Sequence, residues 1–133
     1  MSSSDSKEET KGLNKERIVM YLFVNNDLKM GKGKIAGQVG HAVQHLIQHL
    51  VVSPTPEYIE WTRGGLSTKI VCKATQEQLG ELITKWYETK GMYMEVIFDA
   101  GKSQITAGSM TVIGFSPKYQ RDIPKEWSGF PLL

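Results

Sequence analysis

The sequence predicts an α/β fold: a three-layer sandwich in which a mixed four-stranded sheet carries helices on both faces, in the order β-α-α-β-α-β-β. Apolar runs of strand length alternate with longer segments whose apolar residues recur at helical spacing. The chain has 133 residues, 40% of them hydrophobic, which is enough for one compact core and too little for two domains. No apolar run approaches the roughly 20 residues that a membrane-spanning helix needs, so we expect no membrane partner.

Four segments are predicted to be strands. Residues 18–24 (IVMYLFV) are almost wholly apolar and rich in β-branched and aromatic side chains, which is typical of a strand buried on both faces. The other predicted strands are 68–74, 92–98 and 109–115.

Three segments are predicted to be helices. The longest, 34–51, has apolar residues along one side and polar residues along the other. A short helix at 57–63 follows, and a third is expected at 77–90, where Thr75 and Gln78 have the spacing of a capping box. These helices separate the predicted strands and complete the α/β alternation.

The N-terminal residues 1–16 are predicted to form a disordered polar tail before a single domain at 17–133. The tail is rich in serine and charge, so burial cannot offset the entropy of ordering it. Residues 1–17 hold four acidic and four basic side chains, which leaves the formal net charge of +2 on the rest of the chain. The single cysteine, Cys72, fits a reducing compartment, and the tail has no secretory or mitochondrial pattern, so we expect the cytoplasm.

Three lysines, Lys29, Lys32 and Lys34, lie within six residues between the first strand and the long helix, together with Gly31 and Gly33. A glycine-bearing loop that leads into a helix N-terminus can bind an anion through its backbone N–H groups. The spacing excludes a nucleotide-binding P-loop, because only one residue separates the two glycines. The alternative is a solvated loop whose lysines only aid solubility.

Three histidines, His41, His45 and His49, are spaced four residues apart on the polar side of the long helix. Two histidines at this spacing can bind zinc, but the glutamate of H-E-x-x-H and any cysteine pair are missing, so we expect no metal. His45 and His49 are predicted to face solvent. His41 lies nearer the lysine loop and is either a structural histidine or a donor or proton carrier in a site.

Asp99 directly follows the third predicted strand, where α/β sheets commonly place ligands. Hydroxyl and amide side chains come after it: Ser103, Gln104, Thr106, Ser109 and Thr111. These groups could hold a water against the carboxylate for general-base catalysis. The alternative is an aspartate that caps a turn among ordinary polar loop residues.

Four stretches carry a recognisable pattern, together with the terminal Leu-Leu: DLKMGKGKIAGQVGHA at 27–42, KIV at 69–71, DAGKSQI at 99–105 and GSMTVIGF at 108–115. In order and spacing they resemble the peptidyl-tRNA hydrolase 2 family, the archaeal and eukaryotic type. The resemblance implies hydrolysis of the ester between a peptide and the 3′ end of tRNA, without metal or cofactor. It also implies a mixed four-stranded sheet flanked by helices and, commonly, a homodimer.

The resemblance also implies site residues. The family's proposed catalytic lysine and aspartate fall on Lys34 and Asp99, and its hydroxyls fall on Thr111 and on Ser103, which stands where most relatives have threonine. The substrate-binding residues are expected to be Lys29, Lys32, Gln38, His41, Lys102, Gln104 and Ser109.

Ester cleavage needs an activated water, groups that stabilise the developing oxyanion, and residues that bind the tRNA. Our hypothesis is that Asp99 deprotonates the water and Lys34 stabilises the oxyanion or the leaving oxygen, although a deprotonated Lys34 could itself be the base. Lys29, Lys32 and Lys102 would bind phosphates. Two alternatives remain: a non-catalytic RNA-binding or signalling adaptor on the same fold, and a protein-interaction role of the dimer or the tail.

Overall fold

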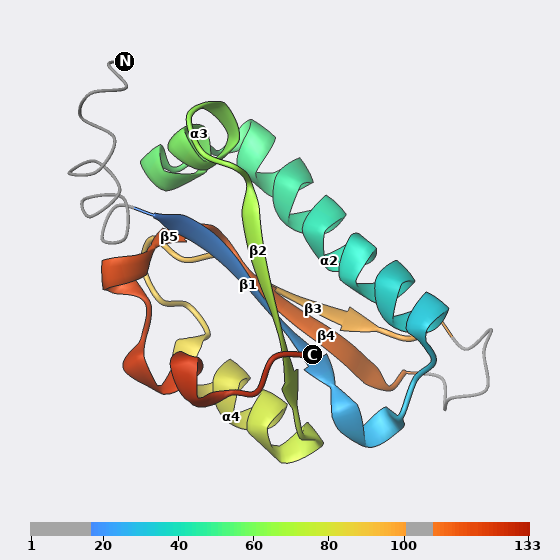
Figure 1. Cartoon of the computed structure of the whole chain (residues 1–133). Helices are drawn as coiled ribbons and strands as arrows, with labels where there is room; N and C mark the ends of the chain where they lie inside the picture. The colour runs from blue at the N-terminus through green and yellow to red at the C-terminus, as the bar shows by residue number, and fades with distance from the viewer. Residues whose placement is uncertain (1–16, 101–107) are drawn as a thin grey trace, which may run out of the picture.

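A computed structural model of the chain describes residues 17–100 and 108–133 (Figure 1). The strands are β1 (Ile18–Asn25), β2 (Thr68–Ala74), β3 (Met94–Phe98), β4 (Met110–Phe115) and the short β5 (Lys118–Tyr119). The helices are α2 (Lys32–Val52), α3 (Pro56–Arg63) and α4 (Gln76–Trp86), with short 3-10 turns at Asn26–Leu28, Gln120–Asp122 and Lys125–Gly129. The predicted tail, residues 1–16, lies outside the described residues.

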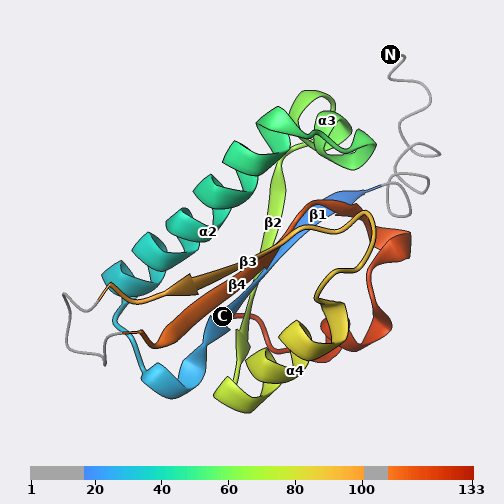
Figure 2. The same ribbon diagram turned by 180° about the vertical axis from the view of Figure 1, so that it is seen from behind.

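The sheet is mixed, and its strands lie in the order β2-β1-β4-β3. β1 is parallel to β2 and antiparallel to β4, and β4 is antiparallel to β3. The short β5 adds a second antiparallel partner at the beginning of β1. Figures 1 and 2 show α2 and α3 on one face of the sheet and α4 with the C-terminal segment on the other. The predicted α/β sandwich is therefore confirmed.

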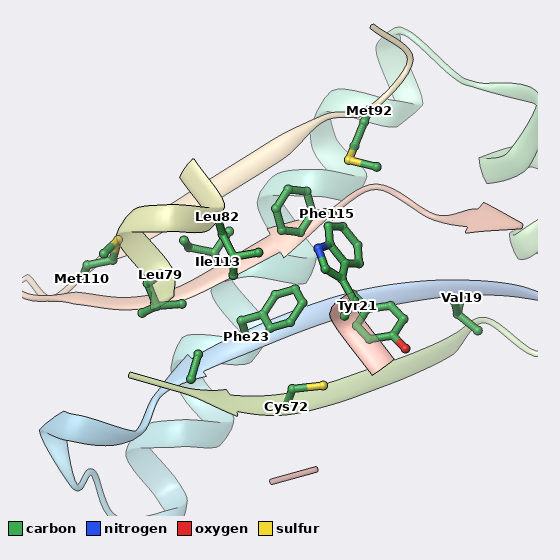
Figure 3. Close-up of a cluster of buried hydrophobic side chains, with 12 residues drawn as sticks. Val19, Tyr21, Phe23, Cys72, Leu79, Leu82, Met92, Met110, Ile113 and Phe115 are labelled. Atoms are coloured by element: carbon green, nitrogen blue, oxygen red, sulfur yellow. The ribbon is translucent and has the colours of Figure 1, made fainter. Parts of the chain in front are cut away.

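β1 is the central strand, and its side chains alternate between two hydrophobic clusters. Tyr21 and Phe23 point into the cluster on the α4 side of the sheet (Figure 3). Each packs at a ring-centroid distance of 5.3 Å against Trp127 from the 3-10 turn Lys125–Gly129. Met20, Leu22 and Val24 point into the cluster beneath α2 and α3. Because both faces of β1 are covered, almost every position in it must be apolar.

Gly114 in β4 lets α2 approach the sheet closely. A Cβ at this position would lie 3.0 Å from Leu46 Cδ1 and 3.1 Å from Leu22 Cδ2. Any larger residue here would require the Leu46 and Leu22 side chains to shift by a few tenths of an ångström, so glycine allows the close packing of α2 on β4.

The predicted helix boundaries lie within two residues of those observed, except for the end of the third helix, which was predicted wrongly. The third helix ends at Trp86 rather than at residue 90, because Tyr87 leaves it in an extended conformation and Glu88 turns the chain at a φ of 61°. Trp86 is the last residue that packs inward, with its ring centroid 5.9 Å from that of Trp127. Tyr87, which the pattern placed on the apolar face, is 64% exposed. The capping box of Thr75 and Gln78 is confirmed.

The two edges of the sheet have different surroundings. At β2 the C-terminal residues run alongside the strand: the Lys73 N–H donates to the Pro131 carbonyl (2.9 Å) and the Leu133 N–H to the Val71 carbonyl (3.0 Å). At β3 the outer side has no backbone partner anywhere in the described part of the chain. Within the same residues, no helix has both the length and the apolar character to cross a membrane.

Candidate active site

The end of β1 fixes where the long helix begins. Asn25 is buried, and its side-chain amide donates to the Met110 carbonyl (2.8 Å) and to Gln76 Oε1 (2.7 Å). Its side-chain oxygen accepts from the Asp27 N–H at 3.1 Å. These bonds tie the loop before α2 to β4 and α4, so the first turn of α2 is held at the end of the sheet.

Lys34 lies in that first turn and forms an ion pair with Asp99, which directly follows β3. The Lys34 side chain is 29% exposed, whereas the Asp99 side chain is fully buried. A buried carboxylate without a cation beside it would be strongly unfavourable. The ammonium of Lys34 therefore stabilises the charged form of Asp99 while keeping its own path to solvent.

The backbone of Asp99 is held against the start of β4. Its N–H donates to the Ser109 carbonyl (2.8 Å), and its carbonyl accepts from the Gly108 N–H (3.1 Å). Gly108 has a φ of +82°, a conformation that glycine adopts without strain. The backbone of Asp99 is thus held at a defined position between the end of β3 and the start of β4.

Thr111 occupies a β-bulge next to this site. The pairing shifts from Ile97–Val112 to Phe98–Met110, which leaves Thr111 as the extra residue in β4. Its hydroxyl donates to the Ile97 carbonyl (3.1 Å) and accepts from Gln38 Nε2 (2.7 Å). Since the single hydroxyl proton is used in this way, Thr111 is placed to hold Gln38 and the end of β3 rather than to donate to substrate.

A hollow of about 480 Å³ opens beside the ion pair, between one side of α2 and the end of β3. It is lined by Lys34, Gln38, His41 and His45 from the helix and by Val96, Ile97, Phe98, Asp99 and Ala100 from the strand and the residues after it. The partly exposed Lys34 side chain therefore meets a space that can admit a substrate, and the fully buried carboxylate of Asp99 lies directly behind it.

The structure brings together four of the predicted site residues: Lys34, Gln38, His41 and Asp99 all line the hollow. Two more lie just behind them, Thr111 against Gln38 and Ser109 against the Asp99 backbone. Lys29 and Lys32 are exposed in and after the loop, outside the residues that line the hollow. Lys102, Ser103, Gln104 and Thr106 lie outside the described residues.

Five lining residues were missed by the sequence analysis: His45 on α2, and Val96, Ile97, Phe98 and Ala100 on and after β3. His45, predicted to face solvent, is half exposed at its side chain, lines the hollow and has its Nδ1 3.4 Å from Glu95 Oε1. Its spacing of four residues from His41 was a usable signal, since both belong to one stripe. Val96 and Phe98 gave no local signal, because they line the hollow only as a result of the position of β3 at the sheet edge.

Two of the three histidines on α2 contact side chains in or next to β3 of the same chain. His49 packs edge-on against Tyr93 with ring centroids 4.0 Å apart, and His45 lies beside Glu95. Among residues 17–100 and 108–133, no three histidine, cysteine or carboxylate side chains are grouped so that they could hold a metal ion.

The mixed sheet, the pairing of Lys34 with the buried Asp99 and the open hollow together define an α/β protein with a candidate acid–base active site. Residues 18–133 match the family model described as peptidyl-tRNA hydrolase PTH2. The chain therefore belongs to the peptidyl-tRNA hydrolase 2 family.

Proteins with similar sequences are named as peptidyl-tRNA hydrolases. The chain is 43% identical over 100 residues to the mitochondrial peptidyl-tRNA hydrolase 2 of Bos taurus, covering 74% of this chain and 54% of that protein. It is 38% identical over 105 residues to a peptidyl-tRNA hydrolase of Saccharolobus islandicus, and equally to one of Saccharolobus solfataricus, covering 75% of this chain and 86% of each. The matched part thus spans about half the length of the bovine relative and most of the archaeal ones.

Proposed function

We propose that this protein is an esterase that hydrolyses the bond between a peptide and the 3′ end of tRNA in peptidyl-tRNA, and thereby returns dropped-off tRNA to translation. Membership of the family supports this activity. The observation that carries the assignment of residues is the direct pairing of Lys34 with the buried Asp99 at the hollow. A non-catalytic adaptor would not need a buried carboxylate kept charged beside an open hollow, and no observation favours that alternative.

In the proposed reaction Asp99 accepts a proton from a water that attacks the ester carbonyl carbon. A new carbon–oxygen bond forms, and negative charge develops on the carbonyl oxygen. The Lys34 ammonium lies against Asp99 at the same hollow, so it stabilises this charge or the ribose oxygen as that oxygen leaves.

The ion pair also provides a route for the protons. When the ester bond breaks, the ribose oxygen takes a proton from Lys34 and leaves as a hydroxyl, and the peptide leaves as a carboxylic acid that then ionises. The proton held by Asp99 passes directly to the neutral Lys34 amine, because the two side chains are in hydrogen-bond contact. This transfer restores the charged pair, and the sum of the steps is ester plus water giving acid and alcohol.

We assign the remaining predicted residues to support of this chemistry. Thr111 positions Gln38 and the end of β3, and Gln38 and His41 contact the substrate in the hollow. Ser103 remains the proposed hydroxyl that holds the water beside Asp99. The other predicted binding residues are Lys29, Lys32 and Lys102 for phosphates, and Gln104 and Ser109.

We also propose that the protein acts as a homodimer in the cytoplasm, without a metal ion. The dimer is suggested by the family resemblance, and the cytoplasm by the buried, unpaired thiol of Cys72, which fits a reducing compartment. The bovine relative is named as a mitochondrial protein. Sedimentation and imaging of the tagged protein in cells test these two assignments.

The function is tested by release of peptide from N-acetyl-aminoacyl-tRNA. We expect Asp99→Asn and Lys34→Ala each to lower kcat by on the order of 100- to 1000-fold, the usual loss when one group that stabilises the transition state is removed. Lys90→Ala and Asp122→Asn are matched controls, because both residues are exposed and distant from the hollow. The pH–rate profiles of the wild type and both variants then show which residue supplies the base. Near-normal turnover by Asp99→Asn would refute the assignment.

A further inference from the structure

The backbone of β3 has a fixed alternation. The Tyr93 carbonyl accepts from the Ser116 N–H at 2.8 Å, and the Asp99 N–H donates to the Ser109 carbonyl at 2.8 Å. The odd-numbered residues of 93–99 therefore direct their backbone groups toward β4.

In an antiparallel pair, the backbone groups of successive residues point to opposite sides of the strand. Val96 and Phe98 therefore direct their N–H and C=O groups away from β4, toward the outer edge of the sheet. No other strand or loop backbone pairs with this edge in the described ranges 17–100 and 108–133.

This outer edge is one wall of the hollow. Five consecutive residues, 96–100, line it, and the opposite wall is the polar stripe of α2 that includes Lys34 and His45. The outward backbone groups of β3 and the Lys34 side chain thus line one continuous space, with Asp99 at its end. A substrate whose ester carbonyl lies at Asp99 would have its next atoms beside the edge of β3.

We propose that the outer edge of β3 binds the peptide part of the substrate as an added parallel strand. The inference rests on the proposed function and specifies which part of the substrate the hollow holds. The peptide runs parallel to β3 because its C-terminal carbonyl must lie at Asp99, which is also where β3 ends. At about 3.3 Å per residue, Val96 and Phe98 offer hydrogen-bonding groups to three or four peptide residues.

Recognition through the backbone does not depend on peptide sequence, because every peptide offers the same N–H and C=O groups. Side chains would alternate between the polar wall of α2, with Gln38, His41 and His45, and the other side of the sheet, where Phe98 is 58% exposed. Neither side forms a closed pocket, so we expect only weak preferences among peptides.

The test uses peptidyl-tRNAs that carry one to five residues on the same tRNA. KM is expected to fall on the order of tenfold between one and four residues and then to level off. The kcat should stay constant, because strand pairing is equal in the ground state and the transition state. A single N-methyl group is then placed at each amide of the four-residue peptide. Methylation at alternate amides should raise KM about threefold to tenfold, the usual net value of one hydrogen bond, and methylation at the amides between them should not.

The matched protein variants are Val96→Pro and Val96→Ala. Proline removes the outward N–H at an edge position where it takes part in no ladder bond, whereas alanine keeps it. We expect Val96→Pro to raise KM for the four-residue substrate about threefold to tenfold more than KM for N-acetyl-aminoacyl-tRNA, and Val96→Ala to keep the wild-type ratio of the two KM values. If Val96→Pro does not fold, the methylation pattern in the wild type decides.

The outcomes separate the two proposals. Equal KM at all lengths, or equal effects of methylation at every amide, would overturn the strand-pairing inference and leave the esterase function intact. Failure of the wild type to hydrolyse even N-acetyl-aminoacyl-tRNA would overturn the function itself. A Val96→Pro protein that changes from dimer to monomer with unchanged KM would assign this edge to a second copy of the chain and overturn the inference.

Discussion

The two edges of the sheet contrast in what covers them. At β2 the C-terminal residues 131–133 bond to the strand, whereas the outer edge of β3 faces the hollow beside Asp99. An uncovered strand edge is a liability, because it can pair with other chains. The contrast suggests that the chain covers the edge that serves stability and leaves open the edge that serves the substrate. Changes near β3 should therefore affect catalysis, and changes near β2 should affect stability alone.

Outside the Lys34–Asp99 pair, the largest effect is expected from Thr111→Val beside the open edge. Valine has a similar shape but leaves the Gln38 amide and the Ile97 carbonyl without their partner. A small displacement of the site follows, and kcat should fall on the order of 100-fold with a smaller change in KM. Thr111→Ser keeps the hydroxyl and should restore most of kcat. Unchanged kcat in the valine variant, with only a lower melting temperature, would make Thr111 merely structural.

A middle-sized effect is expected from deletion of residues 131–133 at the covered edge. Two backbone hydrogen bonds are lost, so the free energy of unfolding should fall by about 1–3 kcal/mol in urea titrations. The kcat and KM should not change. Leu133→Ala is the control, because it keeps the backbone bond to Val71.

The rate of alkylation of the Cys72 thiol measures the loss of the C-terminal contact at β2 directly. It pairs with Leu132 across this edge and is 1% exposed, and burial raises the pKa of its thiol. Alkylation at neutral pH should therefore be slow in the full chain and faster after the deletion. A deletion that lowers kcat while Cys72 stays protected would contradict the proposed division between the edges.

The smallest effect is expected from Thr75→Ala, at the helix that follows the covered edge. The Thr75 hydroxyl accepts from the Gln78 N–H at 3.0 Å and caps α4, so its loss should cost about 1 kcal/mol of stability. Thr84→Ala is the matched control, since the Thr84 hydroxyl bonds only within the helix and is exposed. Both variants should keep the wild-type kcat provided that Gln76 keeps its bonds to Asn25 and Asp27 in the loop before α2. A change in kcat for Thr75→Ala would show that the two faces are coupled.

The sequence predicted well those features that depend on local pattern. β1 was recognisable because it is apolar on both faces, and α4 was recognisable at its start because Thr75 and Gln78 satisfy each other over three residues. Lys34 and Asp99 were identified by motif, and the structure places them in contact across 65 residues of chain.

Features that depend on distant partners could not be predicted. Gln38 lies on the polar side of a helix and yet is buried, because the hydroxyl of Thr111 meets it from another strand. The end of α4 depends on the packing of Trp86 against Trp127. Trp127 lies far along the chain, outside any local sequence window around residue 86. The exposure of the β3 backbone follows from strand order, and local periodicity carries no information on strand order.

The central position of β1 has a consequence for synthesis of the chain on the ribosome. β1 is made first, but Leu22 pairs with Gly114, which is made 92 residues later. At about 5–20 residues per second, β1 waits about 5–20 s for this partner, with apolar groups on both of its faces. During that interval the apolar faces of β1 lack their partners, so slow translation between residues 25 and 110 should favour aggregation.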